Sequence, residues 1–337
     1  MEASAETIIL PVRDAIALAR SALLSAGASE AMAAVLARAT IDAELVGKPS
    51  VGLRHLVVFL ESLRAGRIQG HAEPLITSPV PALMKCDSGG GISQLGFEIA
   101  FDELVTKART FGLVIFTSHN GYTTGELGWY TARLADAGLA ALAACNGPAM
   151  LATPASRRPV FCSNPLAFAA PRANGPPLVI DQASSATAFA NIAEAAEREE
   201  AIPPGWAVDE SGEPTTDARA AIRGALLAFG GSRGANIALM VEILAAGIGG
   251  ANWSLDAPDF RSGERSPGAG LFILAIAPQL LAGDFESRLG THLDRLSDEY
   301  GVHVPGAGRL AAREKAEREG ISLPRQLFDS ISSFRHR

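Results

Sequence analysis

Apolar positions recur at helical spacing through the first part of the chain. They predict helices over residues 11–26 and 30–46, because Gly27-Ala28-Ser29 supplies a stop and then a plausible N-cap between them. A third amphipathic stretch, residues 53–65, carries its leucines and a phenylalanine on one face before Gly66 ends it. The amino-terminal part of the chain therefore predicts a layer of helices.

Further along the chain, short apolar runs alternate with helical patterns. We expect helices over 97–111, 125–137, 186–198 and 234–246, and strands over 113–116, 139–144, 166–169, 177–181 and 270–276. This mixture excludes an all-helical bundle and predicts an α/β (mixed α+β) fold. The strand at 113–116 leads directly into Ser118-His119-Asn120-Gly121, at the carboxyl end where α/β sheets commonly place binding groups.

Composition narrows the range of partners. The 337 residues carry a net charge of −7, with 48% hydrophobic and 19% charged residues, which is ordinary for a globular protein. No cluster of lysine and arginine is present that would bind nucleic acid. We therefore expect a small-molecule partner and no nucleic-acid surface.

The amino terminus and the cysteines indicate a cytoplasmic protein. Met1–Glu6 is acidic where a secretory signal would be basic, and Ile237–Ala251 is too short and too interrupted to span a bilayer, so we interpret it as a core helix. Cys86, Cys145 and Cys162 have no metal-ligand spacing and suit a reducing compartment. We expect no membrane partner and no metal site.

Four sequence blocks follow one another in an order that resembles a known family. They are Ser118-His119-Asn120-Gly121, Cys162-Ser163-Asn164-Pro165-Leu166-Ala167-Phe168, Asp181-Gln182-Ala183-Ser184-Ser185 and Gly230-Gly231-Ser232-Arg233-Gly234. They resemble the S-x-H-x-G, G-T-N-P-[IL]-A-F, D-x-A-T-S and G-G-x-[KR]-G blocks of the type II malate/L-lactate dehydrogenases. Members of that family are NAD(P)-dependent oxidoreductases of small 2-keto and 2-imino carboxylates. The resemblance extends over roughly residues 10–310 and includes a P-x-G-W-A-[VL]-D stretch that begins at Pro203.

The resemblance implies a fold outside the Rossmann class. The NAD(P)-binding domain would hold a mostly antiparallel seven-stranded sheet, and the protein would be a homodimer. The implied division is a helical segment 1–75, a joining segment 76–115, the NAD(P)-binding and catalytic domain 116–275, and a helical segment 276–337 that returns to the first layer. A Rossmann unit would instead need G-x-G-x-x-G after a strand, and the near match Gly306–Ala311 lies too close to the end.

The resemblance also implies where NADPH or NADH binds, with NADPH favoured. The implied contacts are His119, Asn120, Gly121, Tyr122, Thr123, Ser163, Asp181, Gln182, Ala183, Ser232, Arg233, Pro305, Gly306 and Ala307. Backbone N–H groups freed by Gly121 and Gly231, with a cation at the start of the following helix, would suit a phosphate. Relatives usually carry lysine where Arg233 stands, so the charge is kept while its geometry changes. Taken alone, the glycine turn also reads as an ordinary loop before a helix.

The family's proton donor is missing from this chain. Relatives carry D-S-H-G-V-x-R, with the histidine as proton donor and the arginine gripping the substrate carboxylate. Here the aligned stretch is Pro49-Ser50-Val51-Gly52-Leu53-Arg54-His55, so Val51 replaces the histidine and His55 replaces the arginine. Asn191 stands where imine-reducing relatives have the aspartate that pairs with that histidine. The acid and its partner are therefore absent together.

Other residues could take over these roles. The catalytic candidates are His119 as proton-transferring group, Asp181 and Ser50; the substrate-binding candidates are His55, Arg54 and Asn191. His55 lies one helical turn beyond Val51 and could hold the carboxylate or replace the acid, although a single histidine is more often a packing residue.

The missing acid bears on the substrate. A cyclic 2-imino carboxylate can arrive as a protonated iminium, so hydride addition needs no acid from the protein. We therefore expect reduction of Δ1-pyrroline-2-carboxylate or Δ1-piperideine-2-carboxylate. The alternatives are a 2-hydroxy acid dehydrogenase of malate or lactate type and a dinucleotide-binding sensor without catalysis.

Overall fold

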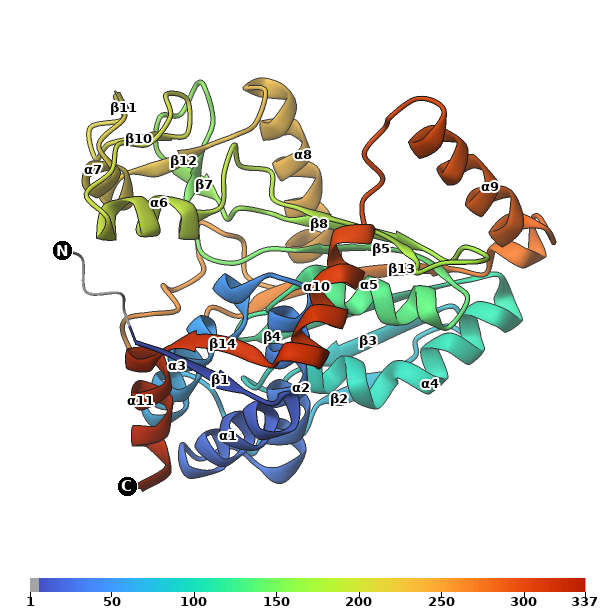
Figure 1. The fold of residues 1–337 in the computed structure, drawn as a ribbon, viewed down its shortest axis with the longest axis horizontal. Coiled ribbons are helices and arrows are strands. Elements are labelled where there is room, and N and C mark those ends of the chain that lie inside the picture. Colours follow the sequence, from blue (N-terminus) through green and yellow to red (C-terminus); the bar gives the residue numbers. More distant parts are fainter. Residues whose placement is uncertain (1–5, 337) are drawn as a thin grey trace.

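A computed structural model describes residues 6–336 (Figure 1), so most of the acidic start, Met1–Glu6, lies outside the described residues. The three predicted amino-terminal helices are confirmed as α1 (Val12–Ser25), α2 (Glu30–Leu45) and α3 (Leu53–Arg64). Ser29 caps α2, since its Oγ accepts a hydrogen bond of 3.2 Å from the Met32 N–H. Between α2 and α3 lies a short 3₁₀ turn, η1 (Pro49–Val51).

The central sheet has seven strands. Their order across the sheet is β2 (Leu75–Thr77), β3 (Leu83–Asp87), β4 (Leu113–Gly121), β13 (Ala269–Ile276), β5 (Ala140–Cys145), β8 (Leu166–Ala170) and β9 (Leu178–Gln182). The expected mostly antiparallel sheet is corrected to a mixed one, because β3 runs parallel to β4 while the other neighbours are antiparallel. The helix α4 (Ser93–Phe111) connects β3 to β4, which is the crossover that a parallel pair requires.

The sequence blocks meet at one end of the strands of this sheet. The strand β4 ends at Gly121, which is in register with Ala269 at the start of β13. In the same way β5 ends at Cys145, and Leu166 at the start of β8 pairs with Gln182 at the end of β9. The blocks around residues 119, 163 and 181 therefore meet at the same end of the sheet, as the strand reading predicts for the first of them.

A second sheet has five strands that periodicity did not predict. Its order is β11 (Pro214–Thr215), β10 (Ala207–Val208), β12 (Ala225–Leu227), β6 (Leu151–Ala152) and β7 (Pro159–Phe161). The helices α6 (Phe189–Glu197) and α7 (Ala218–Arg223) pack beside it around a small separate core (Figure 1). Most of the stretch over 203–217 is exposed, as its turn residues predict, but the β10 pair is buried.

The helix that follows the glycine turn changes its winding. It is α8 (Ser232–Glu242) and continues as a π-helix, η2 (Ile243–Ile248). The interpretation of Ile237–Ala251 as a core helix is half correct: Val241 and Ala245 are buried, whereas Ile243 and Ile248 are exposed.

The carboxyl-terminal elements return to the first helices. After α5 (Leu127–Asp136) and the late strand β13, the chain forms α9 (Phe285–Asp298), α10 (Ala307–Glu319), β14 (Ile321–Pro324) and α11 (Arg325–Ser333). The strand β1 (Thr7–Leu10) pairs antiparallel with β14, as Figure 1 shows. Ile331 and Phe334 join the core cluster that contains Leu18 of α1. The boundaries of the four predicted segments stay predictions.

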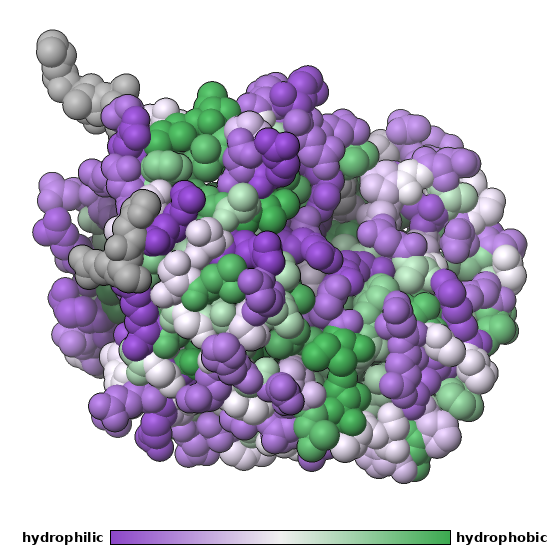
Figure 2. All heavy atoms as spheres, turned by 90° about the horizontal axis from the view of Figure 1, so that it is seen from below, coloured by the Kyte–Doolittle hydropathy of each residue, from purple (hydrophilic) through white to green (hydrophobic). Residues whose placement is uncertain are grey.

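The surface is mixed in character. Figure 2 shows apolar patches separated by hydrophilic side chains on one face. Within residues 6–336, no helix combines the length and the apolar character that a membrane crossing demands.

Candidate active site

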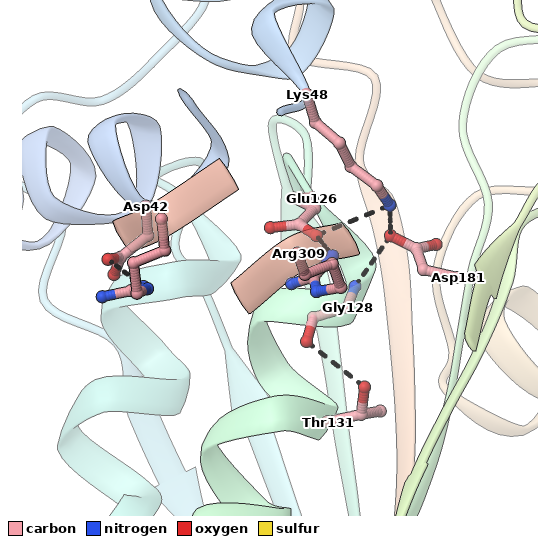
Figure 3. Close-up of polar contacts among 8 residues, drawn as sticks. Asp42, Lys48, Glu126, Gly128, Thr131, Asp181 and Arg309 are labelled. Carbon is pink, nitrogen blue, oxygen red and sulfur yellow. Dashed lines mark hydrogen bonds and ion pairs between the residues drawn. The ribbon is translucent and has the colours of Figure 1, made fainter. Parts of the chain in front are cut away.

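Four alternating charges lie beside the end of β9 (Figure 3). Lys48 Nζ is 2.6 Å from Asp181 Oδ2 and 3.5 Å from Glu126 Oε1. Arg309, from α10, donates to the same Glu126 oxygen, and the Gly128 N–H donates to Asp181 Oδ2 at 3.0 Å. The Glu126 and Asp181 side chains are 2% and 10% exposed, so each carboxylate depends on a nearby cation for its stability.

A neighbouring ion pair fixes α10 in the same place. Arg313 donates to Asp42 Oδ1 at 2.9 Å, and Trp129 Nε1 donates to Asp42 Oδ2 at 3.1 Å. The helix α10 is therefore bound to α2 through Asp42 and to the start of α5 through Glu126. Sequence reasoning missed Lys48, Glu126 and Arg309, because none of them belongs to a recognised block and the contact of Lys48 with Asp181 joins residues that are 133 apart in the sequence.

The space beside Val51 is small and mostly apolar, with a few polar groups in its wall. Val51 lines a cavity of about 10 Å³ together with Gln94 and Glu126, which is room for about one water. Among the described residues, Gln94 Oε1 and Glu126 Oε2 are buried without a hydrogen-bond partner. No group at position 51 can transfer a proton, in agreement with the sequence comparison.

His119 has a carboxylate beside it. The parallel pairing of β3 with β4 brings Asp87 into register with His119, and Asp87 Oδ2 lies 3.8 Å from His119 Nε2. The pKa of Asp87 is lowered, first by the hydrogen bond from the Gly89 N–H and further by the Asn120 side chain and the charge of His119. The Nδ1 atom of His119 is buried and has no partner among the described residues. An ionised carboxylate thus faces one imidazole nitrogen of His119, while the other nitrogen is buried without a hydrogen-bond partner in the described part of the chain.

His55 is a neutral residue in an aromatic setting. Its ring meets Phe59 edge-on at 4.7 Å between centroids, and its Nε2 lies 3.5 Å from Thr123 Oγ1. Burial, and secondarily the charge of Arg261, lower the pKa of His55 to about 4. Near neutral pH this imidazole can hydrogen-bond a carboxylate but brings no positive charge to it.

The neutral state of His55 predicts a loss of stability in acid. Its pKa in the folded protein lies below the ordinary value of 6.5, so the unfolded chain binds the proton first as the pH falls. We expect the free energy of unfolding to fall by about 2 kcal/mol through this group between pH 6.5 and pH 4, a value reduced for its partial exposure. Denaturant unfolding of His55→Gln at several pH values should lack this part of the fall. The matched change His292→Gln, at an exposed position, should keep the wild-type profile; equal profiles for all three proteins would contradict the prediction.

The remaining candidates near η1 and α6 lie at the surface. Ser50 and Arg54 are exposed, and Asn191 is exposed with its Nδ2 donating to Thr187 Oγ1 at 2.9 Å. Tyr122 is fully buried, and its hydroxyl contacts Ser62 Oγ at 2.7 Å. The Tyr122 N–H also donates to the Gly91 carbonyl at 2.9 Å, so the cofactor contact expected at Tyr122 stays a prediction, as do the catalytic and substrate-binding roles of the others.

Three of the sequence blocks are joined by backbone hydrogen bonds. The Ser184 N–H donates to the Ser163 carbonyl at 2.8 Å, and the Phe229 N–H donates to the Ser184 carbonyl at 3.1 Å. Gly230 and Gly231 follow with φ values of 55° and 63°, in the left-handed region that favours glycine. This turn opens α8 and uses two of its first N–H groups, because the Arg233 N–H donates to the Gly230 carbonyl at 3.4 Å and the Gly234 N–H to the Phe229 carbonyl at 3.0 Å. The exposed side chains of Ser232 and Arg233 are the groups there that can bind an anion.

Most of the predicted cofactor contacts lie near the strand ends that carry the sequence blocks. Gln182 and Ala183 stand next to the ion-paired Asp181, and Ser232 and Arg233 begin α8 with their side chains partly or fully exposed. Pro305, Gly306 and Ala307 line a separate cavity of about 140 Å³ beside β9. The structure thus brings the blocks around 163, 181 and 230 together and leaves 305–307 on the outer side of β9.

A buried carboxylate holds the Cys162–Phe168 block. Glu242 accepts from Asn164 Nδ2 at 2.8 Å, from the Ser254 N–H at 2.6 Å and from Ser254 Oγ at 2.7 Å. These three hydrogen bonds compensate for its burial. They also tie the block to α8 and to the loop before β13, so Glu242 holds the block in position.

Comparison with known proteins defines the class. The chain is 36% identical over 307 residues to the Δ1-pyrroline-2-carboxylate/Δ1-piperideine-2-carboxylate reductase of Pseudomonas aeruginosa, covering 90% of this chain and 92% of the relative. It is 33% identical to the (2R)-3-sulfolactate dehydrogenase (NADP+) of Chromohalobacter salexigens, covering 97% and 98%. Both relatives are oxidoreductases, and this chain is an oxidoreductase as well.

The match to one family extends over nearly the whole chain. Residues 10–332 match the sequence family described as malate/L-lactate dehydrogenase, and the protein belongs to it. The crystal structure of the Δ1-piperideine-2-carboxylate reductase from Pseudomonas syringae pvar. tomato superposes with a TM-score of 0.92 at 31% identity, covering 97% of this chain and 99% of that one. The resemblance inferred from the four blocks is therefore confirmed.

Proposed function

We propose that the protein reduces a small cyclic 2-imino carboxylate with NADPH or NADH, giving the cyclic L-amino acid. The observation that carries the proposal is Val51, which stands in place of the family's proton donor in a chain similar to imino-acid reductases. A protonated iminium already carries the proton that the product amine keeps. The reaction therefore proceeds without the missing acid, whereas reduction of a ketone needs a proton on the new alkoxide.

The residues near the strand ends that carry the sequence blocks suit the cofactor. The glycine turn at 230–231, the start of α8 and the exposed Arg233 would hold a phosphate, and a guanidinium matches a 2′-phosphate well, which favours NADPH. The bound nicotinamide would supply the hydride. His119, with its unpartnered Nδ1, would contact the nicotinamide or the substrate, and Ser163 and Asp181–Ala183 would line the same strand ends.

The proposed binding mode lies outside the Rossmann class. Gly306 opens α10 and follows a stretch without a strand, so a βαβ unit does not begin there. In this proposal the cofactor binds at the strand ends that carry the sequence blocks, and no βαβ unit is needed.

Assembly and location are proposed as well. We propose a homodimer, because α8 and η2 expose Leu239, Met240, Ile243 and Ile248. We propose a cytoplasmic location because the cysteines suit a reducing compartment. Sedimentation of the purified protein tests the dimer: a monomer at micromolar concentration would contradict it.

Two other functions remain as competing hypotheses. A 2-hydroxy acid dehydrogenase is favoured by the similarity to the sulfolactate dehydrogenase and by the His119–Asp87 pair, which could protonate an alkoxide. A sensor without catalysis is favoured by the loss of the family's proton donor at Val51.

A substrate panel separates the three. NADPH and NADH oxidation should be followed with Δ1-pyrroline-2-carboxylate, Δ1-piperideine-2-carboxylate, pyruvate and oxaloacetate. We expect kcat/KM to be highest with an imino acid. Higher values with a keto acid would favour the dehydrogenase, and tight cofactor binding with no turnover on any substrate would favour the sensor.

A further inference from the structure

A 2-imino carboxylate needs a cation for its carboxylate, and the position that supplies it in the family holds a neutral residue here. The cations around that position are mostly engaged. Lys48 and Arg309 bind Asp181 and Glu126, so their charges are balanced. Arg67 is buried and donates to Ser62 Oγ and to the Gly263 carbonyl.

Arg261 is a guanidinium without an ion pair among the described residues. Its central carbon lies 5.0 Å from the ring centroid of Phe260 and 5.0 Å from that of Phe189. The nearby Asp259 uses its carboxylate for the Arg261 backbone N–H and for Ser262 Oγ, at 2.9 Å each. Two aromatic rings therefore hold the guanidinium while its donors stay available for an anion.

The loop that carries Arg261 is fastened to the predicted nicotinamide segment. The Tyr122 hydroxyl donates to the Phe260 carbonyl, and the Arg67 guanidinium donates to the Gly263 carbonyl at 3.1 Å. The Phe260 ring also lies 6.1 Å from that of His55. Arg261 is thus adjacent both to the 119–123 block and to the position where relatives carry the carboxylate-binding arginine.

A cavity of about 410 Å³ lies in front of this guanidinium. Its wall includes the apolar residues Phe189, Met150, Ile222 and Leu255, the Arg261 guanidinium and the Asp259 carboxylate. Asp259 accepts hydrogen bonds from the Arg261 N–H and from Ser262 Oγ, so the guanidinium is the charged group that is available to an anionic ligand. This mixed lining suits a small ring that bears a carboxylate.

We propose that Arg261 binds the substrate carboxylate and thereby selects carboxylate-bearing imines, a role that rests on the proposed function. The guanidinium forms the ion pair, the rings of Phe189 and Phe260 keep it in place, and His55 adds a neutral hydrogen-bond donor or acceptor at most. The cation that relatives carry at the position of His55 is thus supplied here by Arg261, in the loop before β13.

Selectivity between two imines tests this role. Kinetics should compare Δ1-pyrroline-2-carboxylate with 2-methyl-1-pyrroline, in which a methyl group replaces the carboxylate. Arg261→Met should raise KM for the carboxylate about 30- to 100-fold, with a small change in kcat and unchanged constants for the methyl compound. Arg261→Lys should recover part of the loss, because the charge is kept while the planar donor geometry is not.

Two matched variants locate the effect. Arg265→Met removes the same charge from the same exposed loop and should leave both substrates within about twofold of wild type. Arg54→Met tests the competing clamp suggested by the sequence. Loss of carboxylate selectivity in Arg54→Met, or its retention in Arg261→Met, would overturn the proposal.

A binding measurement separates this proposal from the proposed function. Calorimetric titration with pyrrole-2-carboxylate, a planar carboxylate that is not reduced, should show weaker binding to Arg261→Met by the same factor and unchanged binding of NADPH. If the wild-type protein reduces no imine but shows this difference, the proposed reaction fails and the carboxylate site stands. If the wild type binds the acid no better than Arg261→Met, the site is wrong whatever the reaction.

Discussion

With a 2-keto acid as substrate, replacing His119 by alanine is expected to lower kcat by about 10²- to 10⁴-fold, whereas with a cyclic 2-imino acid the loss should stay within about tenfold. The difference arises because the alkoxide formed from a ketone must gain a proton, while an iminium already carries one. The arrangement behind this expectation is that the Asp87 carboxylate lies 3.8 Å from His119 Nε2, at the end of β4. Steady-state kinetics with both substrate classes measures the effect.

Asp87→Asn is the companion variant. It removes the charge beside His119 but leaves the imidazole, so we expect a smaller loss in the same direction with keto acids. An equal loss with both substrates, together with a raised KM for NADPH, would instead assign His119 to cofactor binding alone.

Replacing Lys48 by methionine is expected to lower the free energy of unfolding by about 2 to 3 kcal/mol and the melting temperature by roughly 5 °C or more. The Lys48 side chain is 31% exposed, so the loss is smaller than for a fully buried pair. Among the residues that the structure describes, removal of the ammonium group leaves Asp181 with the Gly128 N–H and Glu126 with Arg309. Calorimetry and urea unfolding measure both quantities.

Controls for Lys48 use one exposed pair and one double variant. Arg198→Met breaks an exposed pair with Glu194 and should cost less than about 0.5 kcal/mol. Adding Asp181→Asn to Lys48→Met should recover part of the stability, because the stranded charge is gone. Strictly additive losses would show that the two side chains are not coupled.

Local patterns predicted the larger elements well and failed where pairing is remote. The amphipathic faces of α1, α2 and α3 and the apolar strands β4 and β13 carry their own signal in periodicity. The two-residue strands β6, β10 and β11 are too short to show any period. The parallel pairing of β3 with β4 was missed for another reason, since no local pattern states which strand lies next to which.

In the candidate site as well, some residues could be predicted from the sequence and others are revealed by the folded chain alone. A family resemblance can find the blocks that contain His119, Ser163 and Asp181. The fold places all three near the same end of the strands. Arg309 reaches Glu126 across 183 residues of sequence, and only the folded chain shows that contact. Arg261 escaped notice because its chemistry depends on two phenylalanine rings from different segments.

The pairing of β1 with β14 has a consequence for biosynthesis. The strand at Thr7–Leu10 is synthesised before the whole of the chain that separates it from its partner, Ile321–Pro324. Arg309 likewise reaches Glu126 only after the residues between them have been made. The first helices share their core with Ile321 and Leu323, so this core stays incomplete during translation until β14 has been synthesised.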